Sequence, residues 1–479
     1  MNASLIILEI AVLILGLGIL LDDLWMSGEG KRLLGYVAAA GLGLVLLYSF
    51  VRMDPAVPQF AFGQSYVLDG LALFFKRFFL VAAILVLVMA VEFSDRLETG
   101  ISEFYSLTLF ALAGMMFAAS ANDFVMLFVS IELITVTFYV LTSFQRRRLG
   151  SLEAGVKYLI LGALSSALLV YGIALVCGTA GTMNFGELAK RAPQLQGNTV
   201  FLLGLLLVLM GLGFKIAAFP MQLWTPDVYQ GSPTPTTAFL AVGSKAAGFI
   251  LLLRLLFTAL PREFTVSWVK LLMAISAITI LYGSLCAIPQ RNLKRLLGYS
   301  SIANAGYLLL GVAALSQAGT AAVLYFLSGY LFTLLAAFSV IVLIMRTTEA
   351  EDISSLAGLS QRSPFLAATM TLAMVSLAGV PPLAGFFGKF LLIKAVLDAG
   401  PAYYWLVGVA LFGVVVSLWY YFGVIRAIYW SGSAAGQAAI RVPRPLQASL
   451  AVCVVGMLWL GLYPTPVLRA AEAAVQALK

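Results

Sequence analysis

Long apolar runs, separated by short polar loops, make up almost the whole chain. A helix needs about 20 apolar residues to cross a bilayer, and these runs lack the alternation typical of barrel strands. Only 10% of the residues are charged, against about 25% in a soluble domain. The sequence therefore predicts an all-α membrane protein with about fourteen spans, near 4–21, 33–51, 71–91, 103–119, 123–143, 157–177, 200–230, 234–258, 267–288, 298–315, 319–345, 364–396, 402–430 and 447–465.

The composition excludes several classes of cofactor site. The chain has no histidine, and its three cysteines, Cys177, Cys286 and Cys453, lie far apart in the sequence. Ordinary zinc sites, His-ligated haem and Cys₄ iron–sulfur clusters are therefore not expected. The sequence also contains no GxGxxG, Walker-type or GxSxG motif, so it gives no sign of nucleotide or acyl-transfer chemistry.

The basic residues behind the net charge of +8 gather in particular loops. Loops after odd-numbered spans hold most of them: Lys31, Arg32, Arg146, Arg147, Arg148, Arg291, Lys294, Arg295, Arg362, Arg441 and Arg444. Because basic loops stay in the cytoplasm, we predict a multi-pass protein of the bacterial cytoplasmic membrane with both termini on the periplasmic side. Since the first run contains Glu9 and has no basic segment before it, we interpret it as an uncleaved helix.

Two spans are interrupted by proline in a similar way. Pro220 breaks the seventh, and Pro381 with Pro382 breaks the twelfth. Broken helices at membrane depth need protein or a water-filled cavity around the freed backbone groups, and paired breaks are typical of inverted repeats. The breaks lie five spans apart, which predicts two inverted five-helix repeats. The expected units are helices 1–3 (residues 1–100), repeat A (101–260, helices 4–8), repeat B (261–432, helices 9–13) and C-terminal helix 14 (433–479).

Four isolated charges lie well inside these apolar spans: Glu132, Lys215, Lys245 and Lys389. Ionisable residues within membrane helices are costly and are a functional hypothesis by default. At about 4 Å and an effective dielectric constant of 20, one opposite-charge pair is worth roughly 4 kcal/mol. A change in the Glu132–Lys215 separation would therefore load or unload a proton. We expect the four side chains to form a line of titratable sites joined by water.

Other charged residues permit simpler interpretations. Lys76 and Arg254 lie near span ends, where long side chains can reach the interface. Glu153 and Lys157 are four residues apart and form an ordinary helical pair, or join the relay if they face inward. Asp227 lies in a turn and is expected to stabilise it.

Three segments carry a resemblance to a known family: KIAAFPMQLWTPDVYQGSPTPTTAFLAVGSKAAGF, RNLKRLLGYSSIANAGYLLLG and SLAGVPPLAGFFGKF. Together they resemble subunit N of bacterial NADH:quinone oxidoreductase (respiratory complex I), which is a member of the antiporter-like subunit family. The resemblance covers nearly the whole chain. It implies a subunit of a proton-pumping translocase that moves protons while electron transfer occurs in other subunits.

The resemblance assigns roles residue by residue. Glu132 resembles the buried glutamate of helix five, and Lys215 the pumping lysine of helix seven. Lys245 resembles the connecting lysine of helix eight, and Lys389 the lysine of helix twelve. The implied partners are another antiporter-like subunit on one side and small membrane subunits on the other. FMN, iron–sulfur clusters and quinone would belong to partner subunits, with no cofactor, metal or nucleic acid bound to this chain.

The sequence departs from the family pattern at Gln222 and Asn304, where the family often has histidine. Neither side chain can change charge, so a proton passing there would travel on water. Two other readings stay open. One is an Mrp-type cation/proton antiporter subunit, which needs the same midplane charges. The other is a quinone-binding enzyme, for which the sequence shows no polar and aromatic site.

Overall fold

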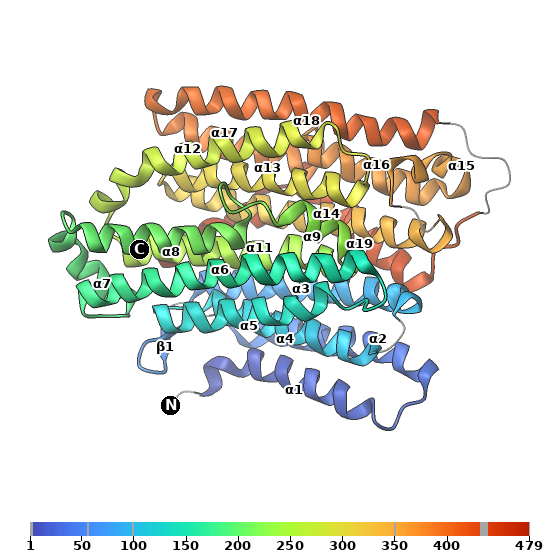
Figure 1. Cartoon of the computed structure of the whole chain (residues 1–479), viewed down its shortest axis with the longest axis horizontal. Coiled ribbons are helices and arrows are strands. Elements are labelled where there is room, and N and C mark those ends of the chain that lie inside the picture. The colour runs from blue at the N-terminus through green and yellow to red at the C-terminus, as the bar shows by residue number, and fades with distance from the viewer. Residues whose placement is uncertain (1–2, 55–56, 98–99, 349–350, 432–438, 479) are drawn as a thin grey trace.

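The computed structural model describes residues 3–54, 57–97, 100–348, 351–431 and 439–478. Its helices run nearly parallel in one elongated bundle (Figure 1). Thirteen helices in the described part of the chain are long and apolar enough to cross a membrane. A shorter apolar helix, Pro364–Ala378, belongs to the broken twelfth span. The predicted all-α membrane fold is confirmed.

The first three spans form a side-by-side group. They are α1 (Ile7–Asp22, after the 3₁₀ turn Ala3–Ile6), α2 (Gly28–Arg52) and α3 (Gly70–Phe93). Between α2 and α3, β1 (Gln59–Ala61) pairs antiparallel with β2 (Tyr66–Leu68), with Phe60 opposite Val67. The sequence patterns did not predict this hairpin, because its strands have only three residues each. Asp69 then caps α3 by accepting a hydrogen bond from the Ala72 N–H.

Helices four to six are continuous. They are α4 (Ile101–Ala119), α5 (Phe124–Thr142) and α6 (Leu149–Ala180). The Asp123 side chain accepts from the Met126 N–H and is therefore the N-cap of α5. A short surface helix, α7 (Phe185–Arg191), follows and was not expected. It is too short and too polar to resemble a span.

The seventh and eighth spans are both irregular. The seventh consists of α8 (Thr199–Ile216) and α9 (Thr225–Gly231), separated by eight non-helical residues around Pro220. The eighth runs from α10 (Thr234–Phe239) through the π-helical segment η4 (Leu240–Ser244) into α11 (Lys245–Arg254) and a second π-helical segment, η5 (Leu255–Ala259). π-helical segments are rare in proteins overall, but many of those that occur lie at functional sites. The position of η4 directly before Lys245 therefore marks this lysine for attention.

The second half begins with α12 (Arg262–Ala287), α13 (Leu293–Ala313) and α14 (Gln317–Thr348). After the short α15 (Leu359–Arg362), the twelfth span consists of α16 (Pro364–Ala378) and α17 (Ala384–Asp398). The chain ends with α18 (Tyr404–Trp430), α19 (Arg444–Leu462) and α20 (Thr465–Val475). The helix α20 packs on α3 and α14 and was not predicted.

Burial identifies the centre of the bundle. The span Thr234–Ala259 is buried by other parts of the chain except for the partly exposed Phe257 and Thr258, and Leu293–Ala313 and Gln317–Arg346 are nearly as enclosed. By contrast, only about a third of the residues in the apolar stretches of α1, α2 and α6 are buried. Lys245 therefore lies on the most enclosed helix of the protein.

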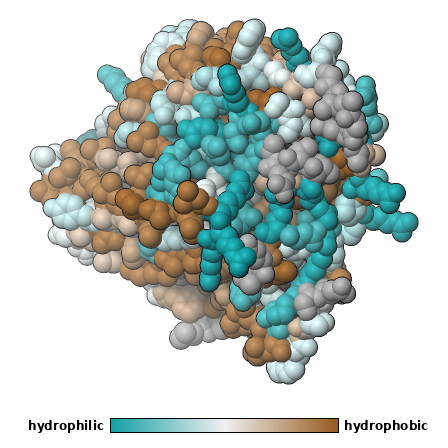
Figure 2. Space-filling view, turned by 45° about the vertical axis from the view of Figure 1, so that its right-hand side comes forward, coloured by the Kyte–Doolittle hydropathy of each residue, from teal (hydrophilic) through white to brown (hydrophobic). Residues whose placement is uncertain are grey.

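The two ends of the bundle differ. Both chain termini lie at the left end in Figure 1, while the short loops after α1 and α5 lie at the right end. Figure 2 turns that right end forward and shows hydrophilic residues gathered there between hydrophobic flanks. Lys294 and Arg295, expected in the loop before the tenth span, lie instead in the first turn of α13, and Lys294 is fully buried.

Candidate functional site

The two helix breaks share a local backbone pattern. A residue in the left-handed region ends the first half-helix in each case: Ala217 (φ 60°) after α8 and Gly379 (φ 84°) after α16. A proline follows three residues later, at Pro220 and Pro382. This repeated pattern agrees with the pairing of helices seven and twelve, and the breaks at Pro220 and Pro381 are found where expected. The domain boundaries based on that pairing stay a prediction.

Lys215 lies in the last turn of α8 and is 5% exposed. Its Nζ donates to the Thr135 hydroxyl on α5, and it lies 5.9 Å from the Tyr158 ring centroid. Glu132 is one turn before Thr135 on the same helix, half-buried, and accepts from Ser166 Oγ at 2.5 Å. Because residues three apart are neighbours on a helix, the carboxylate is close to the lysine site without forming an ion pair.

Lys245 begins α11 and is 2% exposed. Its Nζ donates to the Ser301 backbone carbonyl at 2.6 Å and also to the Ser301 hydroxyl, both on α13. The same hydroxyl lies 3.0 Å from Tyr229 Oη of α9. Tyr330 of α14 places its ring centroid 5.8 Å from the ammonium. Hydroxyls and one carbonyl therefore surround this lysine.

Lys389 reaches back from α17 to the open end of α16. Its Nζ donates to the Leu377 carbonyl at 2.7 Å and to that of Ala378 at 3.4 Å. These are carbonyls that the last turn of a helix leaves without intrahelical partners, where positive charge is favourable. A Cβ at Gly379 would lie only 3.1 Å from Lys389 Cδ, so glycine serves both the φ and the space there.

A small cavity lies beside Lys389, and its lining includes Tyr330, whose ring also faces Lys245. Its volume is about 10 Å³, near the minimum of about 10–15 Å³ that a single water needs. Asn304 lines it and donates to the Ser300 carbonyl at 2.9 Å. The remaining lining residues are Phe326, Tyr330, Thr333, Ser376, Leu377, Gly385 and Lys389. Gln222, the other departure from the family pattern, is also buried.

The supporting pair Glu153–Lys157 lies toward the surface. Lys157 Nζ is 2.7 Å from Glu153 Oε1, and the two side chains are 41% and 60% exposed, respectively. The two side chains of this pair therefore do not face the interior of the protein. Lys157 also contacts Asp227 Oδ2 at 2.6 Å, so it connects α6 to α9 instead.

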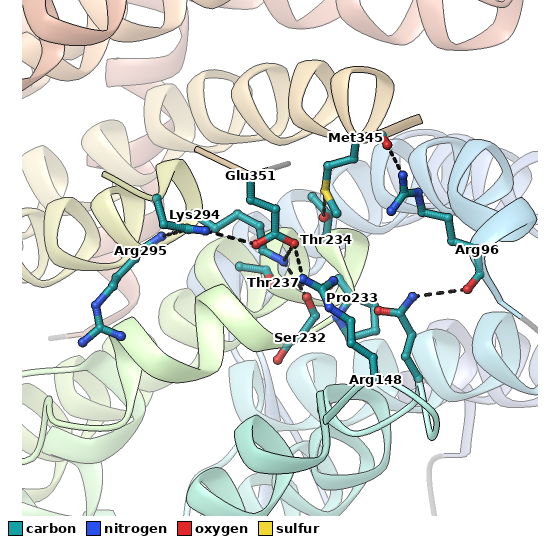
Figure 3. Close-up of polar contacts among 12 residues, drawn as sticks. Arg96, Arg148, Ser232, Pro233, Thr234, Thr237, Lys294, Arg295, Met345 and Glu351 are labelled. Carbon is teal, nitrogen blue, oxygen red and sulfur yellow. Dashed lines mark hydrogen bonds and ion pairs between the residues drawn. The ribbon is translucent and has the colours of Figure 1, made fainter. Parts of the chain in front are cut away.

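Sequence reasoning missed a group of ion pairs around α9. Asp227, expected only to stabilise a turn, bridges Lys157 and Arg295. Glu351, just after α14, accepts from Arg148 at 2.7 Å and lies 3.4 Å from Lys294 Nζ. Figure 3 shows Lys294 and Arg148 approaching Glu351 from different directions. The bridges join segments far apart in sequence, so no local pattern signals them.

The electrostatics of Glu351 follow from these neighbours. Burial by itself would raise the pKa of the Glu351 carboxyl, but Lys294 and Arg148 hold that pKa below its ordinary value. The carboxylate therefore stays ionised at neutral pH.

Lys76 and Arg254 were expected to extend to the membrane interface, and this expectation is wrong. Lys76 is fully enclosed and lies 2.7 Å from Glu9 Oε1. Arg254 is 2% exposed and donates to both oxygens of Asp69, at 2.9 and 3.0 Å. Both cations are thus neutralised by carboxylates inside the protein. Among the described residues, no group of three or more His, Cys, Asp or Glu side chains gathers as a metal site would require.

Comparison with known proteins agrees with this arrangement. Residues 121–417 match the family model "NADH:quinone oxidoreductase/Mrp antiporter, TM". The chain is 40% identical to the NADH-quinone oxidoreductase subunit N of Moorella thermoacetica over 97% of this chain and 96% of the relative. A chain of respiratory complex I from Thermus thermophilus superposes with a TM-score of 0.81 and 32% identity, covering 98% of this chain and all of the other.

A chain of the Mrp complex from Dietzia sp. has a TM-score of 0.83 but only 20% identity, with full coverage of both chains. The fold alone therefore does not distinguish an Mrp-type antiporter subunit from an oxidoreductase subunit. The sequence identity to subunit N distinguishes them.

The broken helices and buried lysines thus define a membrane protein of the antiporter-like, proton-translocating class. Within that class, the chain belongs to the subunit N family of the NADH-quinone oxidoreductases.

Proposed function

We propose that Glu132, Lys215, Lys245 and Lys389 carry protons through this chain while NADH:quinone electron transfer takes place in partner subunits. One observation carries the proposal. In the described part of the chain, none of the three lysines forms an ion pair with a carboxylate, although all three are buried. Lys76, Arg254 and Lys294, equally buried, each have one.

The difference has a physical consequence. A buried cation with a carboxylate partner is held in its charged form, so it is a poor proton carrier. A buried lysine whose direct partners are only hydroxyls and carbonyls has less to offset the loss of hydration when charged; of the three, Lys215 has a carboxylate nearby, that of Glu132, which is not in direct contact. Such a lysine can therefore exchange its proton with small changes in surroundings, whereas arginine would stay charged.

The contacts suggest an order for the path. Glu132 lies one turn from Thr135 on α5, and Thr135 accepts a hydrogen bond from Lys215. Tyr229 and Ser301 lead to Lys245. From there, Tyr330 and the cavity beside Asn304 lead to Lys389. Because Asn304 does not titrate, a water in that cavity would carry the proton past it.

Glu132 is the proposed point of control by a neighbour. The face of α5 around it exposes Val125, Val129, Val136 and Val140. We place another antiporter-like subunit against one side of the chain and small membrane subunits against the other, in a bacterial inner membrane with both termini periplasmic. A charge on the neighbour would then set the proton affinity of Glu132, which in turn acts on Lys215. FMN, iron–sulfur clusters and quinone belong to partner chains in this proposal.

The test is proton pumping by the assembled complex in sealed vesicles, driven by NADH. We expect Lys215→Ala and Lys389→Ala each to lower the protons moved per NADH oxidised. Lys394→Ala is the matched control, because Lys394 is exposed and pairs with Asp398 on α17, the helix that also carries Lys389. Pumping by Lys215→Ala equal to that of the control would remove this lysine from the path.

A further inference from the structure

The half-helix α9 touches both lysine sites of the first half of the chain. At its start, Trp224 Nε1 donates to the Phe214 carbonyl at 3.0 Å, one residue before Lys215. The Trp224 ring lies 5.0 Å from the Tyr158 ring, centroid to centroid, and Tyr158 faces the Lys215 ammonium. A displacement of α9 would therefore move the aromatic wall beside Lys215.

The other contact runs from α9 to Lys245. Tyr229 of α9 bonds the Ser301 hydroxyl, which itself accepts from Lys245. Tyr229 is buried, and its carbonyl accepts from Thr237 Oγ1 of α10 at 3.2 Å. Thus the N-cap residue of α9, Trp224, contacts the surroundings of Lys215, and Tyr229 within the helix contacts those of Lys245.

Ion pairs also hold α9 at Asp227, which is partly exposed. Asp227 accepts from Lys157 of α6 at 2.6 Å and from Arg295 of α13, and Arg295 also donates to Gln230 at 3.3 Å. Glu153 on α6 lies 2.7 Å from Lys157 and is the other carboxylate near this bridge. Asp227 therefore ties the first turn of α9 to two different helices.

A second anchor follows at the end of α9. Lys294 donates to the Ser232 backbone carbonyl at 2.7 Å, directly after the last residue of the half-helix. Lys294 is held in turn by Glu351, which Arg148 also contacts. Figure 3 shows Ser232 and Glu351 as the two contacts of Lys294. Both ends of α9 are thus fixed by charges from α6, α13 and the segment after α14.

Close packing leaves α9 little freedom between these anchors. A Cβ at Gly231 would lie 2.2 Å from the Gly150 carbonyl oxygen of α6, and one at Gly298 of α13 would lie 3.1 Å from Pro226 Cα. Backbones therefore meet almost directly on both sides, and any shift of α6 or α13 is passed to α9. Packed interiors transmit strain in this way.

We propose that α9 is a connecting element between the Lys215 and Lys245 sites, and that Asp227, through its bridge to Lys157 and Arg295, is a positioning residue for both. The inference rests on the proposed proton path and adds to it the element that couples its first two lysines. The Lys294–Glu351–Arg148 cluster fixes the far end of the same element.

The test uses the assembled complex in sealed vesicles and records both the rate of NADH-driven pumping and the pumping per NADH across a range of pH. We expect Asp227→Asn to slow pumping about tenfold or more, because small misplacements of a reacting group have effects of that size on rates. Its pH profile should also shift, since the surroundings of Lys215 and Lys245 change. Asp227→Glu should restore most of the pumping, because it keeps both ion pairs. Asp398→Asn, which removes an exposed ion pair on α17, is the matched control.

Should Asp227→Asn fail to assemble, Lys157→Gln and Arg295→Gln each remove only one partner of the bridge. We expect Arg295→Gln to have the larger effect, because Arg295 also bonds Gln230. Normal pumping and an unshifted pH profile in these variants would overturn the role of Asp227. If that happened while Lys215→Ala still lost pumping, the proposed path would stand without this coupling; normal pumping by Lys215→Ala would remove the path itself.

Discussion

At the scale of single residues, the partner of a buried charge separates two kinds of site. Lys76 and Arg254 have carboxylate partners at short distance, while Lys215, Lys245 and Lys389 bond to hydroxyls and carbonyls. The first kind keeps a fixed charge and the second favours proton exchange. A lone charge in an apolar run is visible in the sequence, but its partner is not.

Glu351 provides a prediction at this scale. Replacing it by Gln leaves Lys294 buried without its carboxylate, which typically costs about 3–5 kcal/mol. We expect Glu351→Gln to shorten the thermal-inactivation half-life of the detergent-solubilised complex at neutral pH. Asp398→Asn should change it little, because exposed pairs contribute about 0–1 kcal/mol.

The pH dependence of that difference has a definite sign. Because the folded protein lowers the pKa of Glu351, the ionised carboxylate stabilises the fold above its ordinary pKa of about 4.3. That contribution disappears as the pH falls through the lowered value. The half-lives of variant and parent should therefore differ most near neutrality and converge in acid. A constant difference across this range would contradict the assignment.

At the scale of elements, the sequence predicts the broken helices well and their contacts poorly. Pro220 and Pro381 mark both breaks, because proline removes a backbone donor. The π segment before Lys245 has no comparable signal, and α9 resembles a simple continuation of its span. The bridge from Asp227 to Lys157 and Arg295 spans about 70 residues on each side, a separation that local periodicity does not report.

The packing of α9 can be tested directly. A methyl group at Gly231 would meet the Gly150 carbonyl of α6, so Gly231→Ala forces the two backbones apart. Overpacking of this kind typically costs about 1–3 kcal/mol. We expect less assembled complex on native gels and lower pumping per NADH from what assembles. Gly408→Ala on α18 has open space around its Cβ and should match the parent; equal results for both variants would count against a tightly held α9.

At the scale of the whole molecule, the three lysines occupy one enclosed interior while the flanking helices face outward. The number of spans and the all-α class follow from hydrophobic length, because a bilayer fixes how long an apolar helix must be. The β1–β2 hairpin, α7 and α20 could not be predicted in the same way, since short or surface elements obey no such length rule. Which lysines have carboxylate partners depends on helix packing and required the structure.

The central claim is that Lys215, Lys245 and Lys389, which form no ion pair with a carboxylate, exchange protons through water molecules inside the protein. The most direct measurement is the position of ordered water in an experimental structure of the intact complex, at a resolution that shows individual water molecules. The account predicts waters within hydrogen-bonding distance of one another from Lys215 past Ser301 to Lys245, and through the cavity beside Asn304 to Lys389. A dry apolar gap between any two of these lysines, in both reduced and oxidised states of the complex, would contradict it.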